Sequence, residues 1–207
     1  MGALVVQPGC GGGGAAGGGG QLRADVQGRV VDDGTLQPVA GASVSVGGQS
    51  VGTTNALGEF SGQDVPAGDV TFQISLGGYD TLAEQRTLTA NQNNDLRSLP
   101  FYLALTLSPG QGVVTGYVQD ASASAVGSAT VTVTPRSNPS AVCQGTSRTD
   151  GTFKVYQVLA GTADLAAQGT VSQPGQAWLN GIPVPDQSSY NVGTLTLSSG
   201  PPPPPFP

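Results

Sequence analysis

The sequence of 207 residues contains no histidine. This absence removes the commonest general base, the Ser-His-Asp and Cys-His arrangements, and zinc sites built on imidazole. The nearest carboxylate pair is Asp32-Asp33, but neighbours along a strand point to opposite faces, so both are predicted to be solvated turn residues. The polar run 91–95 lacks the glycine and the terminal glutamate of an EF-hand loop. We therefore predict no enzyme, no catalytic residue, no metal site and no cofactor.

Basic residues are also scarce. The chain has seven Lys plus Arg against thirteen Asp plus Glu, for a net charge of −6. Nucleic acids and anionic lipid surfaces attract proteins through clustered positive charge, so the sequence predicts no nucleic-acid partner. It also contains no apolar run of the roughly 20 residues that span a bilayer.

Only two cysteines occur, Cys10 and Cys143, which excludes a disulfide framework but leaves one bridge between them open. Cys10 follows a short apolar run and precedes the glycine-rich stretch 11–20. This order resembles the lipidation site and flexible leader of bacterial lipoproteins, although Gln7 and Pro8 depart from the usual pattern. The alternative is a flexible tail with an incidental cysteine. A membrane contact is expected only through such a lipid anchor.

What the chain does have is an internal repeat. Residues 26–46 return as 114–133, and the turn and aromatic strand at 54–60 return at 149–153. A repeat spacing of roughly 90 residues indicates domain duplication, because solenoid repeats are about 20 to 50 residues long. The apolar residues alternate with a period of two and show no helical period. The predicted fold is all-β: two tandem Greek-key β-sandwiches of about seven strands each, with disordered Gly-rich and Pro-rich tails. The predicted divisions are a leader at 1–21, domains at 22–107 and 112–199, a linker at 108–111 and a tail at 200–207.

The repeated residues have structural interpretations. Gly28 and Gly116 lie in strand interiors, where a neighbouring ring or backbone passes closely. Asp32 and Asp120 end the first strand of each copy and are predicted to cap a turn. The remaining pairs are two turn glycines with positive φ and two aromatic core residues, namely Gly58 with Gly151 and Phe60 with Phe153.

The first copy carries an ordered string of motifs: Gly-x-Val-x-Asp at 28–32, Pro-Val-x-Gly-Ala-x-Val-x-Val at 38–46, Thr-Asn-x-x-Gly-x-Phe at 54–60, Val-Pro-x-Gly at 65–68 and Gly-Gly-Tyr at 77–79. This string resembles the carboxypeptidase regulatory-like domain. The resemblance implies a transthyretin-like or carbohydrate-binding-like sandwich. The second copy lacks the Pro-Val and Gly-Tyr elements, so its assignment depends on the repeat.

Trp178, the only tryptophan, has two interpretations. It is expected to fill the second core, or else to form with Tyr190 a surface on which a sugar ring stacks. The sequence as a whole predicts a non-enzymatic, extracytoplasmic structural or binding module, tethered at a cell surface or in the periplasm. The alternatives are a carbohydrate-binding accessory protein and a self-assembling fibre or adhesin subunit. The expected partners are a surface glycan, a protein or a second copy.

Overall fold

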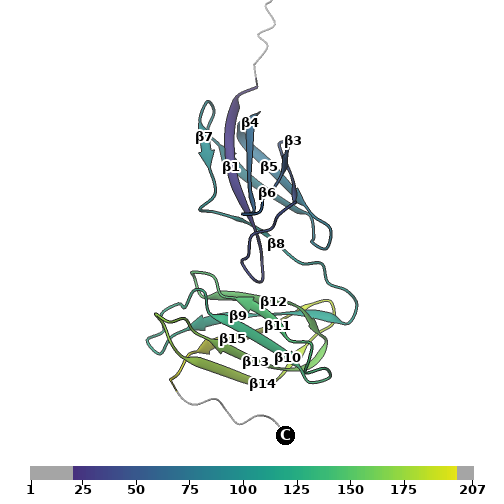
Figure 1. The fold of residues 1–207 in the computed structure, drawn as a ribbon, viewed down its shortest axis with the longest axis vertical. Coiled ribbons are helices and arrows are strands. Elements are labelled where there is room, and N and C mark those ends of the chain that lie inside the picture. Colours follow the sequence, from purple (N-terminus) through teal and green to yellow (C-terminus); the bar gives the residue numbers. More distant parts are fainter. Residues whose placement is uncertain (1–20, 200–207) are drawn as a thin grey trace, which may run out of the picture.

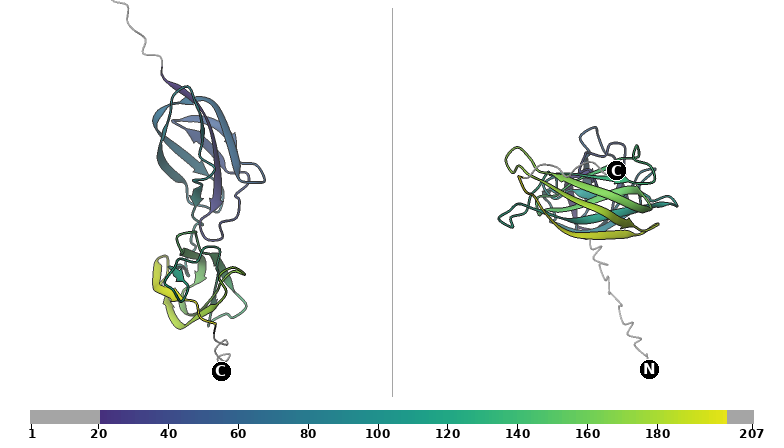
Figure 2. Two further views of the ribbon diagram at one scale, coloured as in Figure 1. Left: turned by 90° about the vertical axis from the view of Figure 1, so that its left-hand side faces the viewer. Right: turned by 90° about the horizontal axis from the view of Figure 1, so that it is seen from below.

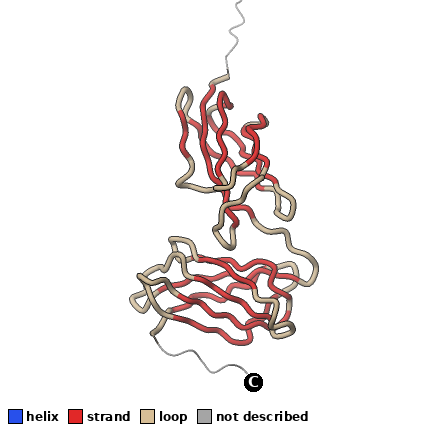
Figure 3. The backbone as a smooth tube through the Cα atoms, viewed as in Figure 1, coloured by secondary structure: helices blue, strands red, loops and turns tan. Residues whose placement is uncertain are grey.

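The computed structural model describes residues 21–199. These residues form strands, turns and loops and contain no helix (Figure 3). The described residues therefore include no helix that is long and apolar enough to cross a bilayer. The predictions for the two tails, including lipidation of Cys10, concern residues outside this range.

Strands β1 to β8 form the first sandwich. One sheet has the order β4-β1-β7, with β8 also pairing with β1, and the other has the order β3-β2-β5-β6. Both β7 and β8 run parallel to β1. The strands are β1 (Arg23–Asp32), β2 (Ser43–Val46), β3 (Gln49–Thr53), β4 (Glu59–Pro66), β5 (Gly68–Ser75), β6 (Leu82–Leu88), β7 (Asn93–Asp95) and β8 (Phe101–Leu103).

Strands β9 to β15 form the second sandwich, from sheets of order β12-β9-β15 and β11-β10-β13-β14. The strands are β9 (Gln111–Gln119), β10 (Thr130–Pro135), β11 (Cys143–Thr146), β12 (Thr152–Leu159), β13 (Gly161–Gln168), β14 (Gln176–Val184) and β15 (Ser189–Thr196). The all-β prediction is confirmed. Figures 1 and 2 show the first sandwich above the second along the long axis of the molecule.

The first six strands of the two sandwiches correspond one to one, and β15 takes the place of both β7 and β8. In each, the first strand pairs with the fourth so that a glycine faces a phenylalanine, Gly28 with Phe60 and Gly116 with Phe153. A Cβ atom on Gly28 would lie 2.3 Å from the Phe60 ring, and one on Gly116 would lie 2.8 Å from the Phe153 ring. The predicted close approach is thereby confirmed, and it explains why neither position carries a side chain.

The correspondence of the next segment differs from the predicted one. The Thr54 hydroxyl accepts from the Ala42 amide and donates to the Val39 carbonyl. In the second sandwich it is the Ser147 hydroxyl, and not that of Thr149, that makes the same two bonds. Residues 54–68 therefore correspond to 147–161 without a gap. Three positions of positive φ support this register, namely Gly58 with Gly151, Asp64 with Gln157, and Gly68 with Gly161.

Two strands were not expected from the sequence in this form. The polar run 91–95 contributes β7, and the Asn94 amide nitrogen donates to the carbonyl oxygens of Asp25, Thr89 and Gln92. In the second sandwich β14 continues to Val184 through Pro183, although prolines usually interrupt strands. A proline is tolerated there because β14 is an edge strand and need not donate on its open side.

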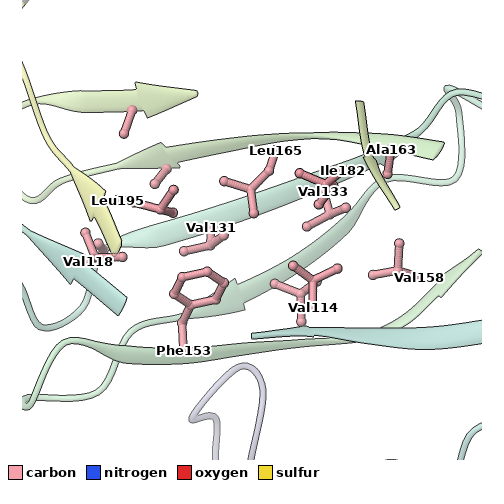
Figure 4. Packing of buried hydrophobic residues seen from close by; sticks show 14 of the residues in the cluster. Val114, Val118, Val131, Val133, Phe153, Val158, Ala163, Leu165, Ile182 and Leu195 are labelled. Carbon is pink, nitrogen blue, oxygen red and sulfur yellow. The ribbon is translucent and has the colours of Figure 1, made fainter. Parts of the chain in front are cut away.

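Each sandwich has its own apolar core. Phe72 and Phe101 of the first stack with ring centroids 4.8 Å apart. Figure 4 shows the second core, in which Phe153 and Val114 from one sheet meet Val131 and Leu165 from the other. Phe60 and Phe153 are 5% and 2% exposed, so their predicted core positions are confirmed.

Candidate functional site: the joint between the sandwiches

The residue that stands out is Asp33, an acidic side chain that is only 5% exposed. It lies in the segment 32–37, which begins at the last residue of β1 and is here called the Asp33 loop. Figure 1 shows this loop reaching from the first sandwich towards β12 of the second. The interpretation of Asp33 as a solvated turn carboxylate is wrong, because the second sandwich covers it.

Four residues of the second sandwich hold the loop. The Lys154 ammonium lies 2.8 Å from Asp33 Oδ2, and the Tyr156 hydroxyl donates to the same oxygen at 2.5 Å. The Arg148 guanidinium pairs with Asp33 Oδ1. The Thr146 amide, on the edge strand β11, donates to the Gly34 carbonyl at 2.8 Å. We call Thr146, Arg148, Lys154 and Tyr156 the Asp33 socket.

The loop presents Asp33 because its neighbour folds the backbone. The Asp32 carboxylate accepts from the amides of Gly34 and Thr35 at 3.0 and 2.7 Å and from the Thr35 hydroxyl at 2.9 Å. Such an Asx turn reverses the chain locally. Asp120 forms the same kind of turn by accepting from the amides of Ser122 and Ser124, so both capping predictions are confirmed.

Arg148 contacts the first sandwich twice. Besides pairing with Asp33, its guanidinium lies 4.0 Å from the centre of the Tyr102 ring, a cation–π contact. It occupies the turn position that Asn55 holds in the first sandwich, since the amides of Asn55 and Arg148 make the corresponding bonds to Glu59 and Thr152. The duplication therefore kept the turn and changed its side chain.

The joint stabilises Asp33 as an anion. Burial alone raises the pKa of this carboxyl, but hydrogen bonds from Lys154 and Tyr156 and the charges of Lys154 and Arg148 outweigh burial, so the pKa lies below its usual range. Burial and the bond to Asp33 raise the pKa of Tyr156, which keeps its hydroxyl a donor. Asp33 is buried while Arg148 and Lys154 are partly exposed, so removing the two cations would leave Asp33 as a buried charge without compensation.

The residues predicted to bind a ligand are placed apart. Trp178 lies on β14 between Ala177 and Leu179, which contact the core, so its ring is on the outer face of the sheet and half-buried. The expectation that it fills the core is wrong. Tyr190 on β15 packs against that core instead. Trp178 and Tyr190 do not share a surface.

The sequence interpretation missed the socket, although it carried one signal. Lys154 is the only lysine, and it and Arg148 are two of only seven basic residues in the chain. Their convergence on one carboxylate depends on how the sandwiches are oriented, which sequence spacing does not determine. Among residues 21–199, no group of three potential metal ligands comes together.

With the fold described, the comparison with known families is direct. Residues 26–101 match the CarboxypepD_reg-like domain. The match begins in β1 and ends at the start of β8, which confirms the resemblance of the first sandwich. No curated protein sequence matches the chain.

Solved structures give more distant similarities. A mutant type II cohesin–X-dockerin complex from Acetivibrio cellulolyticus is 24% identical over 40% of this chain and 58% of that chain, with a TM-score of 0.33. The TIE protein of Bacillus anthracis is 13% identical over 85% and 34%, with a TM-score of 0.35. A streptococcal ancillary pilin is 15% identical over 87% and 64%, with a TM-score of 0.33. The chain spans less than two thirds of each, and at these TM-scores we draw no functional conclusion from them.

Proposed function

We propose that this chain is a non-enzymatic structural module that works outside the cytoplasm and holds its two sandwiches at a fixed separation. The observation that carries the proposal is the joint. A buried carboxylate with three charged or hydroxyl partners from the other sandwich restrains the orientation of the two units more than a flexible linker would. The arrangement of the two sandwiches one above the other along the long axis suits a spacer.

The extracytoplasmic location remains part of the proposal. It is supported by the order of an apolar run, Cys10 and a glycine-rich stretch in the sequence, and tethering through a lipid on Cys10 belongs to the same proposal. A glycan partner receives no separate support, because Trp178 and Tyr190 lie on different surfaces.

The proposal is tested by measuring the distance between the sandwiches. Spin labels are placed at the exposed positions Thr89 and Val171 through T89C/V171C, in a background with C10S and C143S. We expect a narrow distance distribution that broadens in D33A, because the socket then loses its carboxylate. The matched control is D69A, which removes an exposed aspartate of the first sandwich. A distribution already as broad in the parent as in D33A contradicts a fixed separation.

A further inference from the structure

The duplication places a second, open version of the Asp33 socket on the first sandwich. The register that equates residues 54–68 with 147–161 equates Asn55 with Arg148, Ser61 with Lys154 and Gln63 with Tyr156. Pairing of β2 with β3 and of β10 with β11 equates Thr53 with Thr146. We call Thr53, Asn55, Ser61 and Gln63 the β3–β4 corner.

The β3–β4 corner is hollow. A cavity of about 530 Å³ is lined by residues that include Ser61 and Gln63, together with Gln27 and Gln49. A neighbouring cavity of about 450 Å³ is lined by Thr53, Asn55 and Ser61. All four residues that correspond to the socket therefore border open space. β3 and β4 are both edge strands, so each has backbone groups that no neighbouring strand of its sheet pairs with.

The second sandwich also carries an unused version of the Asp33 loop. Residues 120–124, the Asp120 loop, follow β9 as the Asp33 loop follows β1, and the two are shaped by the same aspartate cap. Residues 121–124 are exposed. Asp32 corresponds to Asp120, so Ala121 takes the position of Asp33.

The two sides have changed together. In the joint, an acid on the loop meets two cations in the socket. In the unused pair, the acid is replaced by Ala121, and the cations are replaced by Asn55 and Ser61. The cation–π contact has been lost in the same way. Thr196 pairs with Gln119 as Tyr102 pairs with Val31, so Thr196 corresponds to Tyr102. A threonine thus stands in place of the ring that Arg148 covers. At the positions that carry the charges of the joint, both sides of the unused pair are uncharged, so docking would bury neither an unpaired acid at 121 nor an unpaired cation at 55 or 61.

We propose that these surfaces bind each other between molecules: the Asp120 loop of one copy docks on the β3–β4 corner of a second copy, as the Asp33 loop docks within the chain. Such a contact joins two different surfaces and does not close on itself, so it generates a head-to-tail chain of copies. The proposal uses the geometry of the joint as its template. It does not require that the chain act as a spacer, and the two proposals are tested separately.

The first test transfers the charges of the joint to the new contact. A121D supplies the acid on one chain, and S61K supplies the amine on the other. We expect sedimentation velocity to show that the mixture of A121D and S61K associates at least about tenfold more tightly than either variant alone, with the gain lost at high salt. Association of the mixture no tighter than that of A121D alone overturns the proposal. Circular dichroism checks that both variants fold.

The second test traps the contact in the neutral chain. A121C/S61C, in a background with C10S and C143S, should form a ladder of disulfide-linked oligomers under mild oxidation. The matched control, A121C/N180C, pairs the same loop with an exposed position on β14 and should give no comparable ladder. Equal ladders indicate random collision, and a monomer in both indicates an unoccupied corner. Either outcome overturns the proposal.

Discussion

In each sandwich, a glycine that faces a phenylalanine restricts which substitutions the first strand accepts. The Phe60 ring fills the space where a side chain on Gly28 would lie, so the glycine and the ring form one packing unit. The same pair recurs as Gly116 and Phe153, which explains why these positions were recognisable as a repeat.

G28A is expected to destabilise the protein by about 1 to 3 kcal/mol, because the added methyl group must displace a buried ring. Urea unfolding of the variant measures this loss. G77A is the matched control, since a Cβ there meets no atom within 4 Å. If G28A and G77A cost the same, the close approach of the ring does not constrain this position.

Acid should open the joint at Asp33. The pKa of this carboxyl is lower in the joint than in a free aspartate, so docking is fully favourable above the usual aspartate range of about 4 and is lost as the pH falls through the lowered value. The distance between labels at residues 89 and 171 is therefore expected to stay constant from neutral pH down to about 4 and to broaden below it. D33N should show no such step, and an identical acid step in D33N would assign the opening to other groups.

At the scale of the strand, position on the sheet determines what an aromatic residue contributes. Trp178 was expected in the core because a large aromatic ring next to a leucine is usually buried. Side chains alternate between the two faces along β14, however, so Ala177 and Leu179 point inward and the Trp178 ring lies on the outer face. A shift of one residue in the alternation along a strand therefore decides whether a side chain lies in the core or on the surface.

W178A is accordingly expected to cost only about 1 to 2 kcal/mol, well below a core truncation, since a half-buried ring loses little contact with the apolar interior. F153A is the reference and should cost about 3 to 5 kcal/mol because Phe153 is 2% exposed. Thermal unfolding of the two variants compares them. A loss in W178A as large as in F153A would mean that Trp178 supports the core after all.

Many strand positions along the sequence were predictable from alternation and turn residues, because these act locally. β7 was not, since Asn93–Asp95 is polar and its pairing with β1 depends on the side chain of Asn94. The correspondence of Ser147 with Thr54 was missed because the sequence Thr-Asp-Gly at 149–151 resembles the Thr-Asn at 54–55. The structural equivalence is instead defined by which hydroxyl accepts the hydrogen bond from the alanine amide, and that is the Ser147 hydroxyl. The joint could not be predicted, because Asp33 and Lys154 are 121 residues apart and meet only through the orientation of whole sandwiches.

For the whole molecule, separate cores predict separate folding. Fragments 22–107 and 112–199 each contain a complete apolar cluster, and the contacts between them are mainly polar. We expect each fragment to unfold in one cooperative transition by calorimetry. A fragment 22–107 without such a transition would show that the first sandwich requires its neighbour.

The joint also contains the only ε-amino group of the chain, on Lys154. Acylating reagents attack this amine, and in the joint it contacts Asp33 Oδ2 at 2.8 Å, so the contact competes with the reagent. The rate at which an activated ester modifies Lys154, followed by peptide mapping, would therefore report how readily the two sandwiches separate. The unaltered protein thus carries its own chemical reporter of the contact between the two sandwiches.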